Sequence, residues 1–118
     1  MIDYHAQLVA ALGTVLPTHY EMTLTAGTAT PCLSYMELNN YVDMAADAAE
    51  YSRLTYQIKV WGNDLAELQR YAVQVDAALR PLGWRRTGSR ELYDHNSTMM
   101  QKILTYEALA LEYYTTEV

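Results

Sequence analysis

The fold of this 118-residue chain is decided by the stretch SRLTYQIKVWGNDLAELQRYAVQVDAALRPLG, residues 52–83. Its first third alternates apolar and polar side chains with a period of two, which is typical of a strand with one buried face. The apolar members of this alternation are Leu54, Tyr56, Ile58 and Val60. We therefore predict a strand over residues 53–61.

A helix is predicted immediately after this strand. Gly62 and Asn63 break the alternation. The next four residues match a capping box, in which the Asp64 carboxylate accepts from the amide of Glu67 and Glu67 reaches back to the amide of Asp64. An apolar stripe then recurs at steps of three and four: Leu65, Leu68, Ala72, Val75 and Leu79. Pro81 and Gly83 end the predicted helix.

The N-terminal half is less regular. Residues 3–16 carry a helical apolar stripe that Pro17 stops. Alternation predicts strands over 20–25 and 31–38, and we expect the two to form a hairpin. Residues 39–51, NNYVDMAADAAEY, fit neither period, so we interpret them as a long acidic loop.

The C-terminal part adds two more strands. A short strand is predicted over 84–87, followed by a turn or bulge at 88–90 and a brief resumption before a turn at 94–97. The last strand, 98–111, is apolar on both faces and is expected to be central or covered on both sides. The predicted fold class is α+β, a single mainly antiparallel sheet in the order α-β-β-loop-β-α-β-β with two helices packed on it.

Length and composition indicate one globular domain, residues 1–111, followed by a C-terminal tail, 112–118. The hydrophobic content of 51% argues against disorder. No apolar run approaches the roughly 20 residues that a membrane span needs. The N-terminus lacks a basic segment followed by an apolar one, so we expect no signal peptide. The single cysteine, Cys32, excludes an intrachain disulfide and agrees with a reducing compartment.

Charge and aromatic residues are unevenly distributed. Residues 1–52 hold six acids and neither Lys nor Arg, so the whole net charge of −6 arises there. Four of the eight bases fall within eleven positions: Arg80, Arg85, Arg86 and Arg90. The chain has 11 Tyr and no Phe. Tyr excess indicates surfaces that are buried on assembly; the alternative is that Tyr replaces Phe at the edges of the core.

The sequence shows no pattern typical of an enzyme or a metal site. His5, His19 and His95 do not pair at metal-ligand spacing. Cys32 is interpreted as a small buried apolar side chain. We therefore expect no catalytic residue, no cofactor and no metal.

The Arg85-Arg86 pair beside Trp84 invites comparison with nucleic-acid binding proteins. The net charge of −6 argues against that class, because such proteins present broad basic surfaces. Arg and Trp are favoured as anchors of protein interfaces. We therefore interpret this segment as a protein-facing patch.

In order and length, the segments resemble the tail terminator and tail-completion proteins of long-tailed bacteriophages, over most of the chain. The resemblance rests on a helix ending at Leu16-Pro17, the strand YQIKVWG, the helix DLAELQRYAVQVDAAL, the step Gly83-Trp84 and the late strand QKILTYEAL. The acidic 39–51 segment and the Tyr-rich C-terminus match no pattern of the family.

The resemblance implies a structural virion protein and no enzyme. Such proteins form a ring, usually a hexamer, that ends polymerisation of the tail tube and joins the tail to the head connector. The implied partners are further copies of the chain, the tail tube protein and head–tail connector proteins, with no membrane and with DNA only passing through the lumen. The implied location is the tail or neck of the virion, after assembly in the host cytoplasm. The alternatives are another small α+β neck or tube component, or a cellular ligand-binding or regulatory module.

Three sets of residues are candidates for assembly contacts. The candidates for the subunit interface are Arg80, Trp84, Arg85, Arg86, Arg90, Tyr113 and Tyr114. The candidates for a lumen wall or an inter-ring loop are Asp43, Asp47 and Glu50, with a solvated outer loop as the alternative. The tail 112–118 is expected to act as an assembly arm, the alternative being a frayed terminus.

Overall fold

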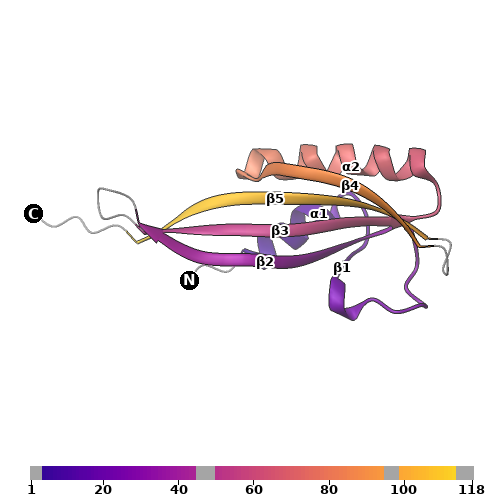
Figure 1. Cartoon of the computed structure of the whole chain (residues 1–118), viewed down its shortest axis with the longest axis horizontal. Helices are drawn as coiled ribbons and strands as arrows, with labels where there is room; N and C mark the ends of the chain where they lie inside the picture. The colour runs from indigo at the N-terminus through magenta and orange to yellow at the C-terminus, as the bar shows by residue number, and fades with distance from the viewer. Residues whose placement is uncertain (1–3, 45–49, 95–98, 114–118) are drawn as a thin grey trace, which may run out of the picture.

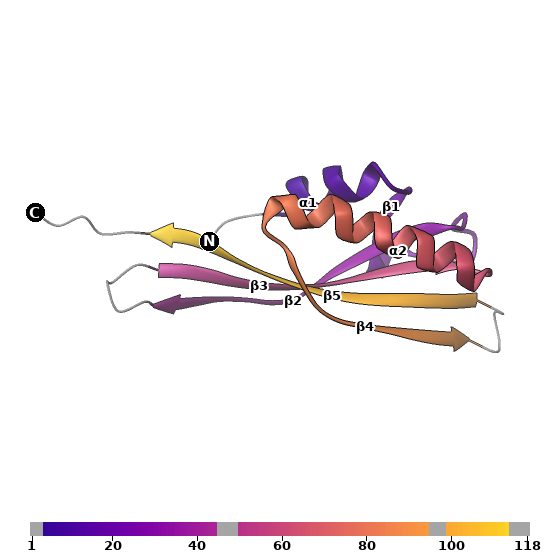
Figure 2. The same cartoon turned by 90° about the horizontal axis from the view of Figure 1, so that it is seen from above.

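A computed structural model describes residues 4–44, 50–94 and 99–113 as one sheet covered on one face by two helices (Figures 1 and 2). The elements in chain order are α1 (His5–Gly13), β1 (Thr18–Tyr20), the 3₁₀ turn η1 (Glu21–Thr23), β2 (Cys32–Met44), β3 (Glu50–Gly62), α2 (Leu65–Leu79), the 3₁₀ turn η2 (Arg80–Leu82), β4 (Arg85–Asp94) and β5 (Met99–Tyr113). The strand order is β1-β2-β3-β5-β4, antiparallel except where β1 joins β2. The predicted α+β class is confirmed.

Strand β3 lies at the centre of the sheet, and its alternation organises the core. Leu54, Tyr56, Ile58 and Val60 are all buried under the helices, whereas the residues between them are partly exposed. Helix α2 contributes its buried stripe of Leu68, Ala72, Val75 and Leu79, and α1 contributes Leu8 and Leu12. The strand and helix predicted from residues 52–83 are therefore confirmed as the central unit.

Helix α2 begins at a capping residue, as predicted, although the donor differs. The Asp64 carboxylate accepts from the amide of Ala66 at 3.0 Å, one residue before the Glu67 amide of the predicted capping box. Leu65, the first member of the predicted stripe, is 46% exposed instead of buried. None of the helices in the described part of the chain is long and apolar enough to cross a membrane.

The aromatic residues divide between core and surface. Tyr56 and Tyr106 are fully buried. Trp84 is also buried, and its ring packs edge-on against Tyr56 at 5.3 Å and against Tyr4 at 6.4 Å between ring centroids. Tyr56 and Tyr106 therefore belong to the core, where their hydroxyls donate to Glu37 and Asp76, while other tyrosines such as Tyr41 remain exposed.

The predicted strand over 20–25 and its hairpin with 31–38 are wrong. Helix α1 ends at Gly13, and the chain then reaches Pro17, whose carbonyl accepts from the amide of Leu33 at 2.9 Å. Residues Thr18–Tyr20 therefore pair with Leu33–Tyr35 in parallel, and residues 21–23 turn away as η1. The apolar residues that alternate beyond Tyr20 are not buried, because η1 turns away from the sheet.

The interpretation of residues 39–51 as a loop is also wrong. Residues 39–44 continue β2 and residues 50–51 begin β3, with the two strands in register from Asn39–Thr55 to Met44–Glu50 after an irregularity at Glu37. Strand β5 runs beside them to Tyr113, opposite Glu50. Residues 112 and 113 of the predicted tail therefore belong to β5, and residues 114–118 lie outside the described part.

These three strands project past both helices and give the molecule its elongated form, 60 × 24 × 22 Å (Figure 1). We call the projecting part the strand extension: residues 41–44 of β2, 50–53 of β3 and 109–113 of β5. No helix of the described chain lies over it (Figure 2). At the other end, β4 is one strand with a bulge between Arg86 and Gly88, close to the bulge predicted at 88–90.

The turn before β4 gives a direct test of the backbone. Gly83 has φ of 92°, a left-handed conformation that L side chains rarely adopt, and a Cβ there would meet no atom within 4 Å. Gly83→Ala should therefore lower the free energy of unfolding by about 1–2 kcal/mol through backbone strain alone. Gly13 is an equally open site without a left-handed φ, so Gly13→Ala is the control. Urea denaturation followed by circular dichroism measures both, and equal stabilities would contradict the turn geometry.

Candidate assembly surfaces

The four arginines predicted to form one basic patch are divided between the two faces of the sheet. Arg80 and Arg86 reach the carboxylate of Asp76 on α2, with N–O distances of 3.1 and 3.4 Å. Arg85 lies on the opposite face of β4, where its Nη2 is 3.8 Å from Oε1 of Glu107. Consecutive residues of a strand point to opposite faces, so a pair that is adjacent in sequence is separated in space.

Arg90 is exposed and returns to the face that carries Arg85. It pairs in register with Ile103 of β5, which in turn lies opposite Lys59. The structure thus brings Arg80 together with Arg86, and places Arg85 and Arg90 on the helix-free face. Whether any of them contacts another subunit remains a prediction.

Asp76 is the centre of a cluster that ties the end of α2 to the sheet. The hydroxyl of Tyr106 donates to Oδ1 of Asp76 at 3.0 Å, beside Arg80 and Arg86. Burial alone would raise the pKa of Asp76, but the hydrogen bonds from Tyr106 and Arg80 and the charges of both arginines lower it overall. Burial and the nearby carboxylate raise the pKa of Tyr106. Arg80 and Arg86 therefore form ion pairs within the chain, at the end of α2 beside the sheet.

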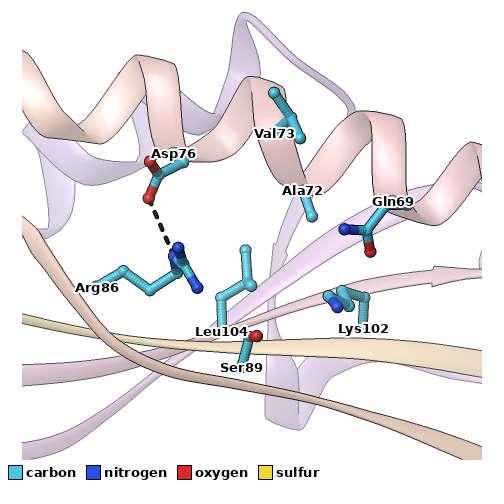
Figure 3. A pocket seen from close by; sticks show the side chains of 8 residues that line it. All are labelled: Gln69, Ala72, Val73, Asp76, Arg86, Ser89, Lys102 and Leu104. Carbon is cyan, nitrogen blue, oxygen red and sulfur yellow. Dashed lines mark ion pairs between the residues drawn. The ribbon is translucent and has the colours of Figure 1, made fainter.

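Beside this cluster a groove of about 150 Å³ runs between α2 and strands β4 and β5 (Figure 3). It is lined by Gln69, Ala72, Val73, Asp76, Arg86, Ser89, Lys102 and Leu104. Sites for small molecules usually measure about 300–1,000 Å³. The groove is therefore smaller than an ordinary ligand site.

Trp84 is removed from the candidates for the subunit interface. Its side chain is 3% exposed in the single chain, because the ring lies between Tyr4 and Tyr56 in the core. An interface anchor must present its ring to the partner. The residue that looked like an anchor from its arginine neighbours instead contributes to stability.

The acidic candidates and the C-terminal tyrosine meet at the free end of the strand extension. Asp43 lies in β2 opposite Tyr51, and Glu50 begins β3 opposite Tyr113, the last residue of β5. Asp47 and Tyr114 fall outside the described residues. The described residues of the predicted acidic loop thus belong to strands β2 and β3.

The strand extension and its base carry exposed apolar side chains that sequence reasoning missed. They are Leu38, Tyr41, Val42 and Leu109, which are 43–58% exposed. Tyr41 and Leu109 are both paired in register with Arg53, so the three form a row across three strands. The available signal was the apolar Tyr41-Val42 pair within a segment that lacks helical or strand periodicity. Exposed apolar clusters of this kind mark interaction sites.

The opposite end of the molecule carries a second exposed apolar cluster. Leu65 at the start of α2 and Leu92 and Tyr93 near the end of β4 are each nearly half exposed. They contribute to a hollow of about 240 Å³ that is also lined by Glu91, Met100 and Gln101. The elongated subunit therefore has two different apolar surfaces, one at each end.

The helix-free face of the sheet carries several ion pairs. Arg53 and Arg85 both approach Oε1 of Glu107, at 3.0 and 3.8 Å. Lys59 forms an ion pair with Glu21 at 3.0 Å. Arg53 and Arg85 share a single carboxylate, and Arg90 is exposed on the same face, so its basic residues outnumber the acids paired with them.

A hollow of about 390 Å³ lies at one edge of this face, against residues 24–30. It is lined by Leu24, Thr25, Ala26, Thr28, Thr30, Cys32, Trp61 and Met99, none of them charged. Cys32 is buried, and burial raises the pKa of its thiol, which disfavours the reactive thiolate. Within the described ranges, no group of three or more His, Cys, Asp or Glu is placed to hold a metal ion.

The Asp76 cluster predicts a pH dependence of stability. The pKa of Asp76 lies below its ordinary value of 3.8, so its contribution is fully present above that value and is lost as pH falls through the folded pKa. Asp76→Asn should cost about 1 kcal/mol at pH 7 and flatten the loss of stability below pH 4. Denaturant titrations between pH 2 and pH 7 measure this. Asp64→Asn is the control, because Asn caps a helix as well as Asp, and identical profiles for the two variants would contradict the cluster's role.

Comparison with known proteins finds similarity in structure. No protein-family model matches the chain, and no curated protein matches it. Among 21 matching chains of solved structures is one from the "Virion of native gene transfer agent (GTA) particle". It has a TM-score of 0.56 and 16% identity, and the match covers 91% of this chain and 86% of that one. At this identity the likeness shows a shared fold, which extends over nearly the whole of both chains.

Proposed function

We propose that this protein is a structural component of a phage-like virion. The observation that carries the proposal is the fold shared with a chain of the gene transfer agent virion over 91% of this chain. Fold alone is an analogy, and the surface gives it independent support. An elongated subunit with a different exposed apolar cluster at each end is suited to contact two neighbours through two different surfaces.

The finer role that we propose is the one implied by the sequence resemblance. The protein forms a ring, usually of six copies, at the neck end of a tail tube, ends tube polymerisation and joins the tail to the head connector. Neither task requires catalysis.

The acidic residues Asp43, Asp47 and Glu50 had two predicted locations, a lumen wall or an inter-ring contact. Two of them lie at the free end of the strand extension, farthest from the helices. The end of the projecting strands β2 and β3 is better suited to touch the next ring than to line a wall. We therefore propose the inter-ring contact, with an acidic surface selecting a basic one on the partner.

The ring makes a simple prediction about mass. Six copies of this 13.4 kDa chain should elute as one species of about 80 kDa and appear as closed rings by negative staining. Added to a polymerising tail tube protein, the rings should also shorten the tubes. Light scattering and electron microscopy measure the two effects. A chain that stays monomeric at all concentrations, or that leaves tube length unchanged, would contradict the proposed role.

The C-terminal tail, residues 114–118, remains our candidate for an assembly arm. Tyr113 of β5 pairs with Glu50 of β3. Truncation after Leu111 would remove this pairing, so the test uses a shorter chain that ends at Tyr113 and keeps the sheet intact. The shorter chain should melt at the temperature of the full chain and form at least tenfold fewer complete particles. Scanning calorimetry and particle counts measure the two properties. Full particle yield from the shortened chain would show that the arm is unnecessary.

A further inference from the structure

The outer side of strand β2 forms a long open edge of the sheet. Strand β1 pairs only with Leu33–Tyr35, so residues 36–44 of β2 have no strand on their outer side in the described part of the chain. Such edges are normally blunted by Lys, Pro, bulges or a short length, and this one is long and has a bulge only between Glu37 and Asn39. The sequence MELNNYVDM contains neither Lys nor Pro, and it exposes Leu38, Tyr41 and Val42. These features indicate that another strand covers this edge.

A matching edge exists on the opposite side of the same sheet. Strand β4 is last in the strand order, so residues 85–94 are open on their outer side. Each successive pair from β2 to β3, β5 and β4 is antiparallel, so β2 and β4 run in opposite directions. Copies related by rotation about one ring axis keep the same strand direction relative to that axis. The β2 edge of one copy therefore meets the β4 edge of the next in antiparallel order, without either subunit turning over.

The two open edges are also staggered along the molecule in the way that closure requires. Glu37 of β2 lies level with Arg86 of β4, through Tyr56 and Tyr106 in the strands between them. From that level the β2 edge continues toward the strand extension, whereas β4 continues toward the opposite end (Figure 1). A sheet that closes on itself needs tilted strands and such a displacement at the joint.

The side chains of the two edges are complementary. Residues 36–44 contain two acids and no base, whereas residues 85–94 contain three arginines and two acids. Arg85 and Arg86 already pair with Glu107 and Asp76 within the chain, so Arg90 is the base of this edge best placed to meet an acid of the neighbour. Each edge also exposes two consecutive apolar residues, Tyr41-Val42 on β2 and Leu92-Tyr93 on β4. Consecutive strand residues point to opposite faces, so joining the edges covers apolar surface on both faces of the sheet.

We propose that residues 36–44 of one copy pair, antiparallel, with residues 85–94 of the next copy, so that the ring is one continuous sheet. The proposal rests on the proposed function, which supplies the second copy as the occupant of the edge. Backbone hydrogen bonds between the edge strands provide affinity, and the side chains provide selectivity. The contact is heterologous, because each subunit uses β2 toward one neighbour and β4 toward the other.

A charge placed on either edge should break the ring. Val42→Lys should reduce assembly at least tenfold, because Lys on an open edge opposes strand pairing. The control is Val73→Lys on α2, since Val73 is 62% exposed and Val42 is 54% exposed, but only Val42 lies on an edge. Leu92→Lys on β4 should act like Val42→Lys, with Leu82→Lys as its control. Light scattering measures mass, and circular dichroism verifies that each variant folds.

Mixing the two edge variants tests the heterologous joint itself. Val42→Lys keeps an intact β4 edge and Leu92→Lys keeps an intact β2 edge, so a mixture should form 1:1 dimers although each variant alone is monomeric. Native mass spectrometry distinguishes the two variants. A mixture that contains only monomers, or rings formed by Val42→Lys alone, would overturn the edge joint. If the wild-type chain still forms rings in that case, the proposed function stands. A wild-type chain that never assembles would overturn both.

Discussion

Helices and strands of equal residue number differ in length, and the architecture of this protein depends on that difference. Helix α2 and strand β5 each contain 15 residues, but a helix of that size is about 22 Å long and a strand about 50 Å. Helices of 15 and 9 residues cover only part of a sheet built from such strands. The core therefore forms under the helices, and the remaining strand length projects as the strand extension (Figure 2).

The same constraint explains which parts of the fold could be predicted. Residues 53–61 alternate because every second side chain of β3 is buried under a helix, so pattern and structure agree. Residues 39–44 also form a strand, but no helix covers their end of the sheet, so the sequence needs no alternation there. Pairing with β3 holds them extended instead. Residues 21–25 show the converse, an alternation without a buried face, which does not form a strand.

Candidate contact residues were harder to predict than the fold, because residue type does not distinguish a core from an interface. Trp84 is of a residue type that often anchors interfaces, but its ring lies against Tyr4 and Tyr56 in the core. Two arginines of the basic segment, Arg80 and Arg86, form ion pairs with Asp76, because they lie close to α2 on the helix-covered side of the sheet. The exposed apolar residues of the strand extension follow no helical or strand periodicity in the sequence. They are recognised only in the structure, where no helix covers these strands.

These features lead to one central claim: open strand edges join neighbouring copies, and the rings form part of a phage-like virion. Hydrogen exchange at the backbone tests the joint most directly, because unpaired edge amides exchange fast and paired ones slowly. Amide exchange in dilute monomer and in assembled protein can be compared by mass spectrometry. The account predicts that amides within residues 36–44 and 85–94 become slower on assembly, more than those of α2. Unchanged exchange in both segments, with slowing elsewhere, would contradict it.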